Sequence, residues 1–257
     1  MSSYDPEKHQ EIVDRLRDEF LVDMRDRLAT IEHALAGADG ADDDALECIR
    51  REAHSLKGMG GAFGFPMISM IAHRLEDYLS GLAALDAGQC REAIVFVDRM
   101  QDIAEAGHDP DGKISQMIVR GLPAHPGAQS TVSAKKDVEV LLVCPSKAIS
   151  HIAMQTLRYL GCRVTTAGSA WEAIELAACA RPDMVVTSAV MTGISGVDLS
   201  RAFAAMDATK DLPIAVLSSF CRDHVELRHL PKDVPVVSLD KSFERDIAEV
   251  IAGFNLD

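Results

Sequence analysis

The sequence predicts two domains: an antiparallel bundle of four helices, followed by an α/β domain with a doubly wound, five-stranded parallel sheet. In the first half, apolar residues recur every three or four positions, the period of an amphipathic helix. In the second half, short β-branched runs alternate with helical segments, as in a parallel sheet with crossover helices. Between them, residues 122–136 (LPAHPGAQSTVSAKK) have the Pro, Gly, Ser and Thr content of a linker. We therefore expect domains at residues 1–121 and 137–257.

The helices of the first domain are predicted from their apolar spacing and their end signals. The first helix covers residues 7–36, and the second begins in the acidic run 42–44, because acidic side chains suit a helix N-terminus. The third begins at Pro66, a residue suited to the first helical turn, and the fourth covers residues 88–106. A short helix near residues 113–120 is expected to cap the bundle. The predicted apolar face of the first helix contains Ile12, Val13, Leu16, Phe20, Met24, Leu28, Ile31 and Leu35.

Five β-branched runs predict the strands of the second domain, and a sheet of this size suits a small doubly wound domain. The runs are VEVLLV (138–143), CRVTT (162–166), MVVTS (184–188), PIAVL (213–217) and VPVVS (234–238).

Composition excludes several classes of function. The net charge of −14 and the lack of clustered Lys and Arg argue against a nucleic-acid partner. The N-terminus lacks the basic start and apolar core of a signal peptide, and no apolar run is long enough to span a membrane. The six cysteines have no paired spacing, which indicates reduced thiols. We therefore expect a cytoplasmic protein without membrane insertion.

No metal site is expected either. The segment HDPDGKI is similar to a calcium-binding loop, but Gly107 and Ile118 stand where its first and last ligands belong, so an ordinary turn is the better interpretation. Cys221, His224 and His229 lack a second pair of ligands, and a polar surface accounts for them.

The segment REAHSLKGMGGAFGF (51–65) is unusual because it places four glycines at the end of a predicted helix. Each glycine inside a helix costs about 1 kcal/mol relative to alanine. His54 faces outward on the predicted helix. Lys57 and Gly58, three and four residues further on, are its neighbours on the helix surface, and Gly58 has no side chain. A nucleophilic histidine that becomes phosphorylated would suit this arrangement, since Lys57 could offset the phosphoryl charge. The alternative is a solvated histidine beside a glycine-rich helix end.

The run AHSLKG (53–58), followed by small residues and Gly64, resembles the active-site helix of histidine-containing phosphotransfer (HPt) domains. The resemblance covers residues 7–106. It implies that His54 is the phosphoacceptor, that Lys57 assists electrostatically and that Gly58 is small to admit a receiver domain.

Residues 137–255 resemble the receiver domain of response regulators, which has a flavodoxin-like fold. The run PDMVVTSAVMTGISG (182–196) follows that family's third strand and loop without a gap. The positions that match the receiver site are Cys144 and Pro145 for the acidic pair, Ser188 for the phosphoaccepting aspartate, Ser218 for the switch residue and Lys241 for the retained lysine. Magnesium needs oxygen ligands, normally carboxylates here, and the three expected carboxylates are absent. The resemblance therefore implies a pseudo-receiver, which would offer its fourth helix, fifth strand and fifth helix (222–254) to partners.

These expectations define a phosphorelay intermediate, in which His54 exchanges a phosphoryl group with aspartates of partner receivers. The expected partners are sensor or hybrid histidine kinases and response-regulator receivers, and the partner receiver would supply magnesium, so the chain itself needs no cofactor. No nucleotide-binding glycine loop is present, so autonomous ATP-dependent kinase activity is not expected. A non-catalytic adaptor that binds receivers or kinases is the alternative. The sequence leaves open the direction of phosphate flow and whether the chain self-associates through the pseudo-receiver. It also leaves open whether the pseudo-receiver inhibits transfer to His54 or recruits partners to it.

Overall fold

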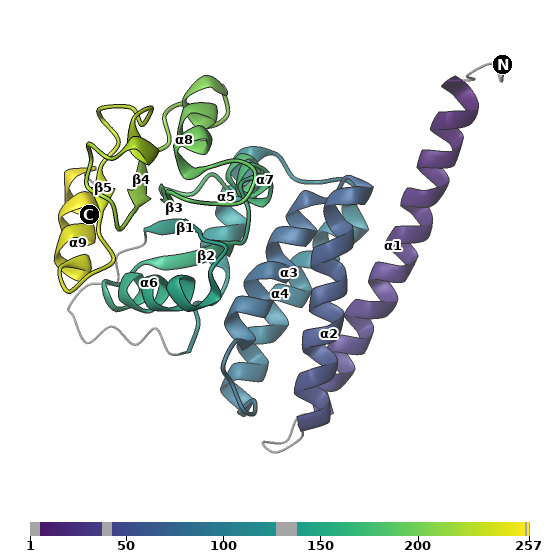
Figure 1. Ribbon diagram of the computed structural model, residues 1–257. Coiled ribbons are helices and arrows are strands. Elements are labelled where there is room, and N and C mark those ends of the chain that lie inside the picture. Colours follow the sequence, from purple (N-terminus) through teal and green to yellow (C-terminus); the bar gives the residue numbers. More distant parts are fainter. Residues whose placement is uncertain (1–5, 38–42, 127–137, 255, 257) are drawn as a thin grey trace. The chain divides into compact units, whose positions relative to one another are not determined.

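The chain divides into two compact units, Met1–His125 and Pro126–Asp257, by the contacts within each. The computed structural model describes residues 6–37, 43–126, 138–254 and 256, so most of the predicted linker lies outside the described residues (Figure 1). Among the helices of the described part, none is long and apolar enough to cross a membrane.

The first unit is the predicted four-helix bundle. Its helices are α1 (Pro6–Gly37), α2 (Asp43–Gly60), α3 (Pro66–Leu79) and α4 (Ala87–Ala106), with a 3₁₀ turn η1 (Gly61–Phe63) and a short helix α5 (Gly112–Gly121). Helix α2 packs between α1 and α3, and α4 closes the ring by contacting both of them. The core is apolar, and Leu28, Ile49, Leu56, Leu75 and Phe96 are fully buried in it. The predicted fold class and helix phasing are confirmed.

Helix α1 is buried over only part of its predicted apolar face. From Phe20 onward that face lies in the core, whereas Ile12, Val13 and Leu16 are exposed. Figure 1 shows why: the first turns of α1 extend beyond the ends of the other helices of the bundle, so no neighbouring helix covers them. The periodicity correctly predicted a helix, but its burial was overestimated at this end.

The segment HDPDG connects α4 to α5, and both of its aspartates accept hydrogen bonds from backbone N–H groups in the first turn of a helix. Asp109 accepts hydrogen bonds from the backbone N–H of Met67, at 3.2 Å to Oδ1 and 3.3 Å to Oδ2, in the first turn of α3. Asp111 caps α5 by accepting from the N–H groups of Lys113 and Ile114, both at 3.0 Å. Burial raises the pKa of Asp109 to about 6, although the Met67 bond and the nearby Arg17 favour its ionised form.

This raised pKa predicts a pH dependence of stability. The folded chain holds the Asp109 proton more tightly than the unfolded chain, so the stabilisation is complete below about pH 4 and is lost as the pH rises through about 6. Asp109→Asn keeps an acceptor oxygen for Met67 but cannot ionise. We expect the free energy of unfolding of the native chain, relative to this variant, to fall between pH 4 and pH 7. Urea unfolding at several pH values measures it, and a pH-independent difference would contradict the prediction.

The second unit contains one parallel five-stranded sheet. Its elements are β1 (Glu139–Val143), α6 (Lys147–Tyr159), β2 (Arg163–Ala167), α7 (Ala170–Ala180), β3 (Met184–Ser188), α8 (Gly196–Ala205), β4 (Ile214–Leu217), η2 (Val225–Leu227), β5 (Val236–Val237) and α9 (Phe243–Gly253). The strand order is β2-β1-β3-β4-β5, which is the flavodoxin-like order. Helices α6 and α9 share one core with the sheet, and α7 packs with α8. The predicted doubly wound domain is confirmed.

The fourth helix expected in the partner surface at residues 222–254 is absent from the structure. In the described segment between β4 and β5, the 3₁₀ turn η2 replaces it. The guanidinium of Arg222 donates to the carbonyls of Pro231 and Val234, which closes the segment into a compact loop. Leu227 and Leu230 are buried there. The predicted surface therefore retains only β5 and α9.

Candidate functional site

His54 lies on the exposed face of α2 and is held by a carboxylate from α3. Its side chain is 80% exposed, and its Nδ1 lies 2.8 Å from Oε1 of Glu76. An ionised carboxylate only accepts hydrogen bonds, so Nδ1 must carry the proton. In the neutral ring the lone pair is then on Nε2, the nitrogen that does not bind Glu76. Glu76 thus orients the ring and fixes the tautomer that a nucleophile requires.

The same carboxylate also binds Lys57. The Nζ of Lys57 lies 3.4 Å from Oε2 of Glu76, so Glu76 bridges the lysine and His54 with its two oxygens. Of the two partners of Glu76, the Lys57 side chain is 29% exposed and the His54 side chain is 80% exposed. Lys57 therefore belongs to the site, but part of its charge is balanced by Glu76.

The glycines that follow His54 have different physical roles. A Cβ on Gly58 would meet no atom within 4 Å, so nothing inside the fold requires a glycine there. A Cβ on Gly60 would lie 2.7 Å from the Ser69 hydroxyl and 2.8 Å from the Phe65 carbonyl, so the close approach of α2 to α3 requires this glycine. Gly64 has a φ of 81°, in the left-handed region that favours glycine. Of these three glycines, only Gly58 has no structural requirement for glycine, so it is the one suited to access.

We expect opposite effects on stability from the same substitution at two of these positions. Gly60→Ala should lower the free energy of unfolding by about 1–3 kcal/mol, because the new methyl overpacks the contact with α3. Gly58→Ala should raise it by up to about 1 kcal/mol, since alanine favours the helix and the site is open. Thermal or urea unfolding of the two variants tests this, and equal effects would show that the contact at Gly60 relaxes at no cost.

His73, on α3, is buried, unlike His54. It is 3% exposed, and burial together with the nearby Lys57 lowers its pKa to about 3, so it stays neutral at physiological pH. The side chain of His73 is buried in the bundle.

In the second unit, the predicted degenerate-site residues lie at or near the carboxyl ends of the strands, where open α/β sheets bind ligands. Cys144 follows β1 and is buried, which raises the pKa of its thiol. Ser188 ends β3 and donates to the Val190 carbonyl at 3.3 Å, and Ser218 follows β4 and accepts from the N–H of Phe220 at 3.0 Å. Lys241 is exposed before α9.

Pro145 follows Cys144 in the loop after β1. The loop after β3 keeps a tight turn: a Cβ on Gly196 would collide with the Ser188 carbonyl. No group of three His, Cys, Asp or Glu side chains able to hold a metal occurs in the described part of the chain. Asp183 is at the other end of β3, where it accepts from the N–H of Glu139 at 2.9 Å.

A comparison with protein families decides the identity of the first unit. Residues 15–106 match the family model of the Hpt domain. This region is an HPt domain. The matched region contains α2, α3, α4 and most of α1, and therefore includes His54.

Part of the chain is also similar to a curated protein. The chain is 28% identical over 119 residues to the chemotaxis protein CheA of Cereibacter sphaeroides. The match covers 40% of this chain but only 17% of the relative.

Solved receiver structures are similar to the second unit. CheY4 of Vibrio cholerae is 24% identical, with a TM-score of 0.40, and the match covers 46% of this chain and 98% of that one. The receiver domain of the sensor histidine kinase PA1611 of Pseudomonas aeruginosa is 21% identical, with a TM-score of 0.41 and the same coverage. The strand order, rather than these likenesses, assigns the fold. The chain therefore joins an HPt domain to a domain with the receiver topology.

Proposed function

We propose that His54 accepts a phosphoryl group from the phosphoaspartate of a partner receiver and can donate it to another receiver. The observation that supports this most is the exposed imidazole whose Nδ1 is bound by Glu76 at 2.8 Å. A ring that is solvent-accessible and fixed as the Nδ1–H tautomer presents a nucleophilic nitrogen to a docking protein. Sensor or hybrid histidine kinases would phosphorylate the first receiver of such a relay.

The transfer balances without an external acid or base. The Nε2 lone pair of His54 bonds to phosphorus as the P–O bond of the acyl phosphate breaks, and the partner's aspartate leaves as a carboxylate. The ring then carries a positive charge with the proton still on Nδ1, where Glu76 stabilises it. The partner receiver supplies magnesium, and the chain itself needs no cofactor. Transfer to a second receiver reverses these steps.

Incubation with isotopically phosphorylated receivers tests the proposal. The chain should become labelled within the time in which the receiver alone keeps its phosphate. A chain that binds phosphorylated receivers without taking label would instead be the non-catalytic adaptor or sequestering protein, and the phosphotransfer proposal would fail.

We also propose that residues 137–257 are a pseudo-receiver that takes no phosphate. Cys144, Pro145 and Ser188 offer none of the carboxylates that magnesium requires at this site. Treatment of this domain with acetyl phosphate and magnesium should leave its intact mass unchanged. A stable gain of one phosphoryl group would overturn this part of the proposal.

The pseudo-receiver would then act as an interaction or regulatory module. Autoinhibition requires that the bundle alone (residues 1–121) accept phosphate faster than the full chain, whereas recruitment requires slower or less selective transfer by the bundle alone. Timed labelling of both proteins by the same receivers distinguishes the two, and identical rates and selectivity would exclude both roles.

A further inference from the structure

Two neighbouring arginines on α2 differ in what holds them. The guanidinium of Arg50 donates to the backbone carbonyls of Leu79 at 2.9 Å and Leu82 at 2.7 Å, and also contacts Glu47 at 2.7 Å. These bonds tie the end of α3 to α2. Arg50 therefore has a structural role, and its guanidinium is already bound by Glu47 and by two backbone carbonyls.

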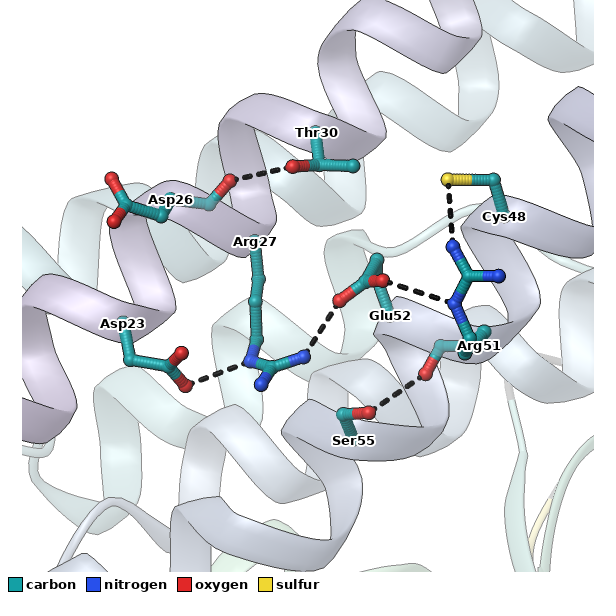
Figure 2. Close-up of polar contacts among 8 residues, drawn as sticks. All are labelled: Asp23, Asp26, Arg27, Thr30, Cys48, Arg51, Glu52 and Ser55. Atoms are coloured by element: carbon teal, nitrogen blue, oxygen red, sulfur yellow. Dashed lines mark hydrogen bonds and ion pairs between the residues drawn. The ribbon is translucent and has the colours of Figure 1, made fainter.

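Arg51 makes weaker contacts. Its side chain is 70% exposed, with Nε 3.3 Å from Oε1 of Glu52 and one terminal nitrogen 3.6 Å from the sulfur of Cys48 (Figure 2). Both contacts lie on its own helix, and in solvent such pairs contribute little. Moving the Arg51 side chain would therefore cost little.

Glu52 does not depend on Arg51 for a partner. Its other oxygen, Oε2, lies 2.7 Å from a terminal nitrogen of Arg27, and the Nε of Arg27 binds Asp23 at 2.7 Å (Figure 2). Glu52 is only 12% exposed, so an unpaired charge there would be costly, but Arg27 pairs it already. Releasing Arg51 leaves no buried carboxylate without a cation.

Once it is released from Glu52, the Arg51 side chain lies close enough to His54 to reach it. The two residues are three apart on α2, so their Cβ atoms are about 5–6 Å apart on one face. Helical side chains lean towards the N-terminus, which tilts His54 towards Arg51. Lys57 lies one turn further on, beside α3, where it shares Glu76 with Nδ1.

We propose that Arg51 leaves Glu52 and binds the phosphoryl oxygens on His54, during transfer and in the phosphorylated chain. A guanidinium offers two parallel donors to a phosphoryl group, which a lysine ammonium cannot match. The inference deepens the proposed function and rests on it. Lys57 would then serve mainly to hold Glu76 and the ring, and Arg51 would neutralise the transferred group.

The test compares Arg51→Gln and Arg51→Lys with Arg99→Gln in the full chain. Arg99 is a matched control, since it is a half-exposed arginine paired with Asp102 three residues away on α4. We expect Arg51→Gln to slow transfer from a phosphorylated receiver about tenfold, Arg51→Lys to recover part of the rate, and Arg99→Gln to have no effect. Equal rates for all four chains would overturn the inference.

A second measurement does not depend on partner receivers. His54 can be phosphorylated chemically with phosphoramidate, and the ³¹P resonance of phosphohistidine and its hydrolysis rate can be recorded. Arg51→Gln should shift the resonance and change the lifetime, whereas Arg99→Gln should leave both as in the native chain. No change with Arg51→Gln would contradict the inference. If receivers fail to label even the native chain, the proposed function fails, while this measurement still decides whether Arg51 contacts the phosphoryl group.

Discussion

His54→Gln should abolish phosphorylation of the chain by receivers, to below the detection limit, while the helical content and melting temperature stay close to those of the native chain. The glutamine cannot form a phosphoramidate bond at neutral pH, but its amide N–H groups can still donate to Glu76, which lies 2.8 Å from the native ring nitrogen. Label on the native chain should be acid-labile and base-stable, as expected for phosphohistidine. Timed labelling followed by acid and base treatment measures both properties.

His33→Gln is the matched control, because His33 is an exposed histidine on α1 in the same bundle. It should be labelled like the native chain. Label that persists in His54→Gln would show that another residue is the acceptor, and His73 is a poor candidate because its side chain is only 3% exposed and a partner's aspartate could not reach it.

The sequence predicted the bundle well because its helices have a clear apolar period and strong end signals. Pro66 begins α3, as expected, and the observed strands of the second unit fall within the predicted runs except β2, which ends one residue later, at Ala167. Residue types alone pointed to His54, since four glycines after a helical histidine have no simple structural explanation. The structure refines that reasoning: Gly60 and Gly64 do have structural roles, and Gly58 does not.

Glu76 was missed because its role depends on contact between helices. It is 22 residues from His54 in the chain, and nothing in its local sequence distinguishes it from other acidic residues on exposed helix faces. Pairing α2 with α3 antiparallel and placing both residues on facing sides could have suggested it. Lys57 was expected to assist the phosphoryl group electrostatically. In the structure its ammonium group instead forms an ion pair with Glu76.

Other errors came from features that periodicity cannot report. An apolar stripe does not show where the neighbouring helices end, so Ile12 and Leu16 were expected to lie on a buried face and are exposed. Likewise, the segment before β5 was assumed to keep a helix because the receiver family has one there. The contacts of Arg222 with two distant carbonyls, which close that segment as a loop, have no local sequence signal.

Gly58→Leu should make the chain more stable and yet slow transfer from receivers by at least about tenfold. Gly58 lies one turn after His54 on the same face of α2 and has no atom within 4 Å of its Cβ position. Leucine favours a helix by nearly 1 kcal/mol over glycine, so the fold should gain stability. The side chain would project into the space that a receiver must occupy to bring its aspartate to His54. Thermal unfolding and timed labelling give the two quantities.

Gly58→Ala separates helix propensity from steric access. It should gain similar stability but lose much less transfer, because a methyl group projects far less than an isobutyl group. A small donor such as phosphoramidate needs no docked protein, so it should label Gly58→Leu at close to the native rate. If Gly58→Leu accepts phosphate from receivers as fast as the native chain, partners approach His54 from another direction. If it loses labelling by phosphoramidate too, the leucine has disturbed the imidazole or Glu76 rather than the docking surface.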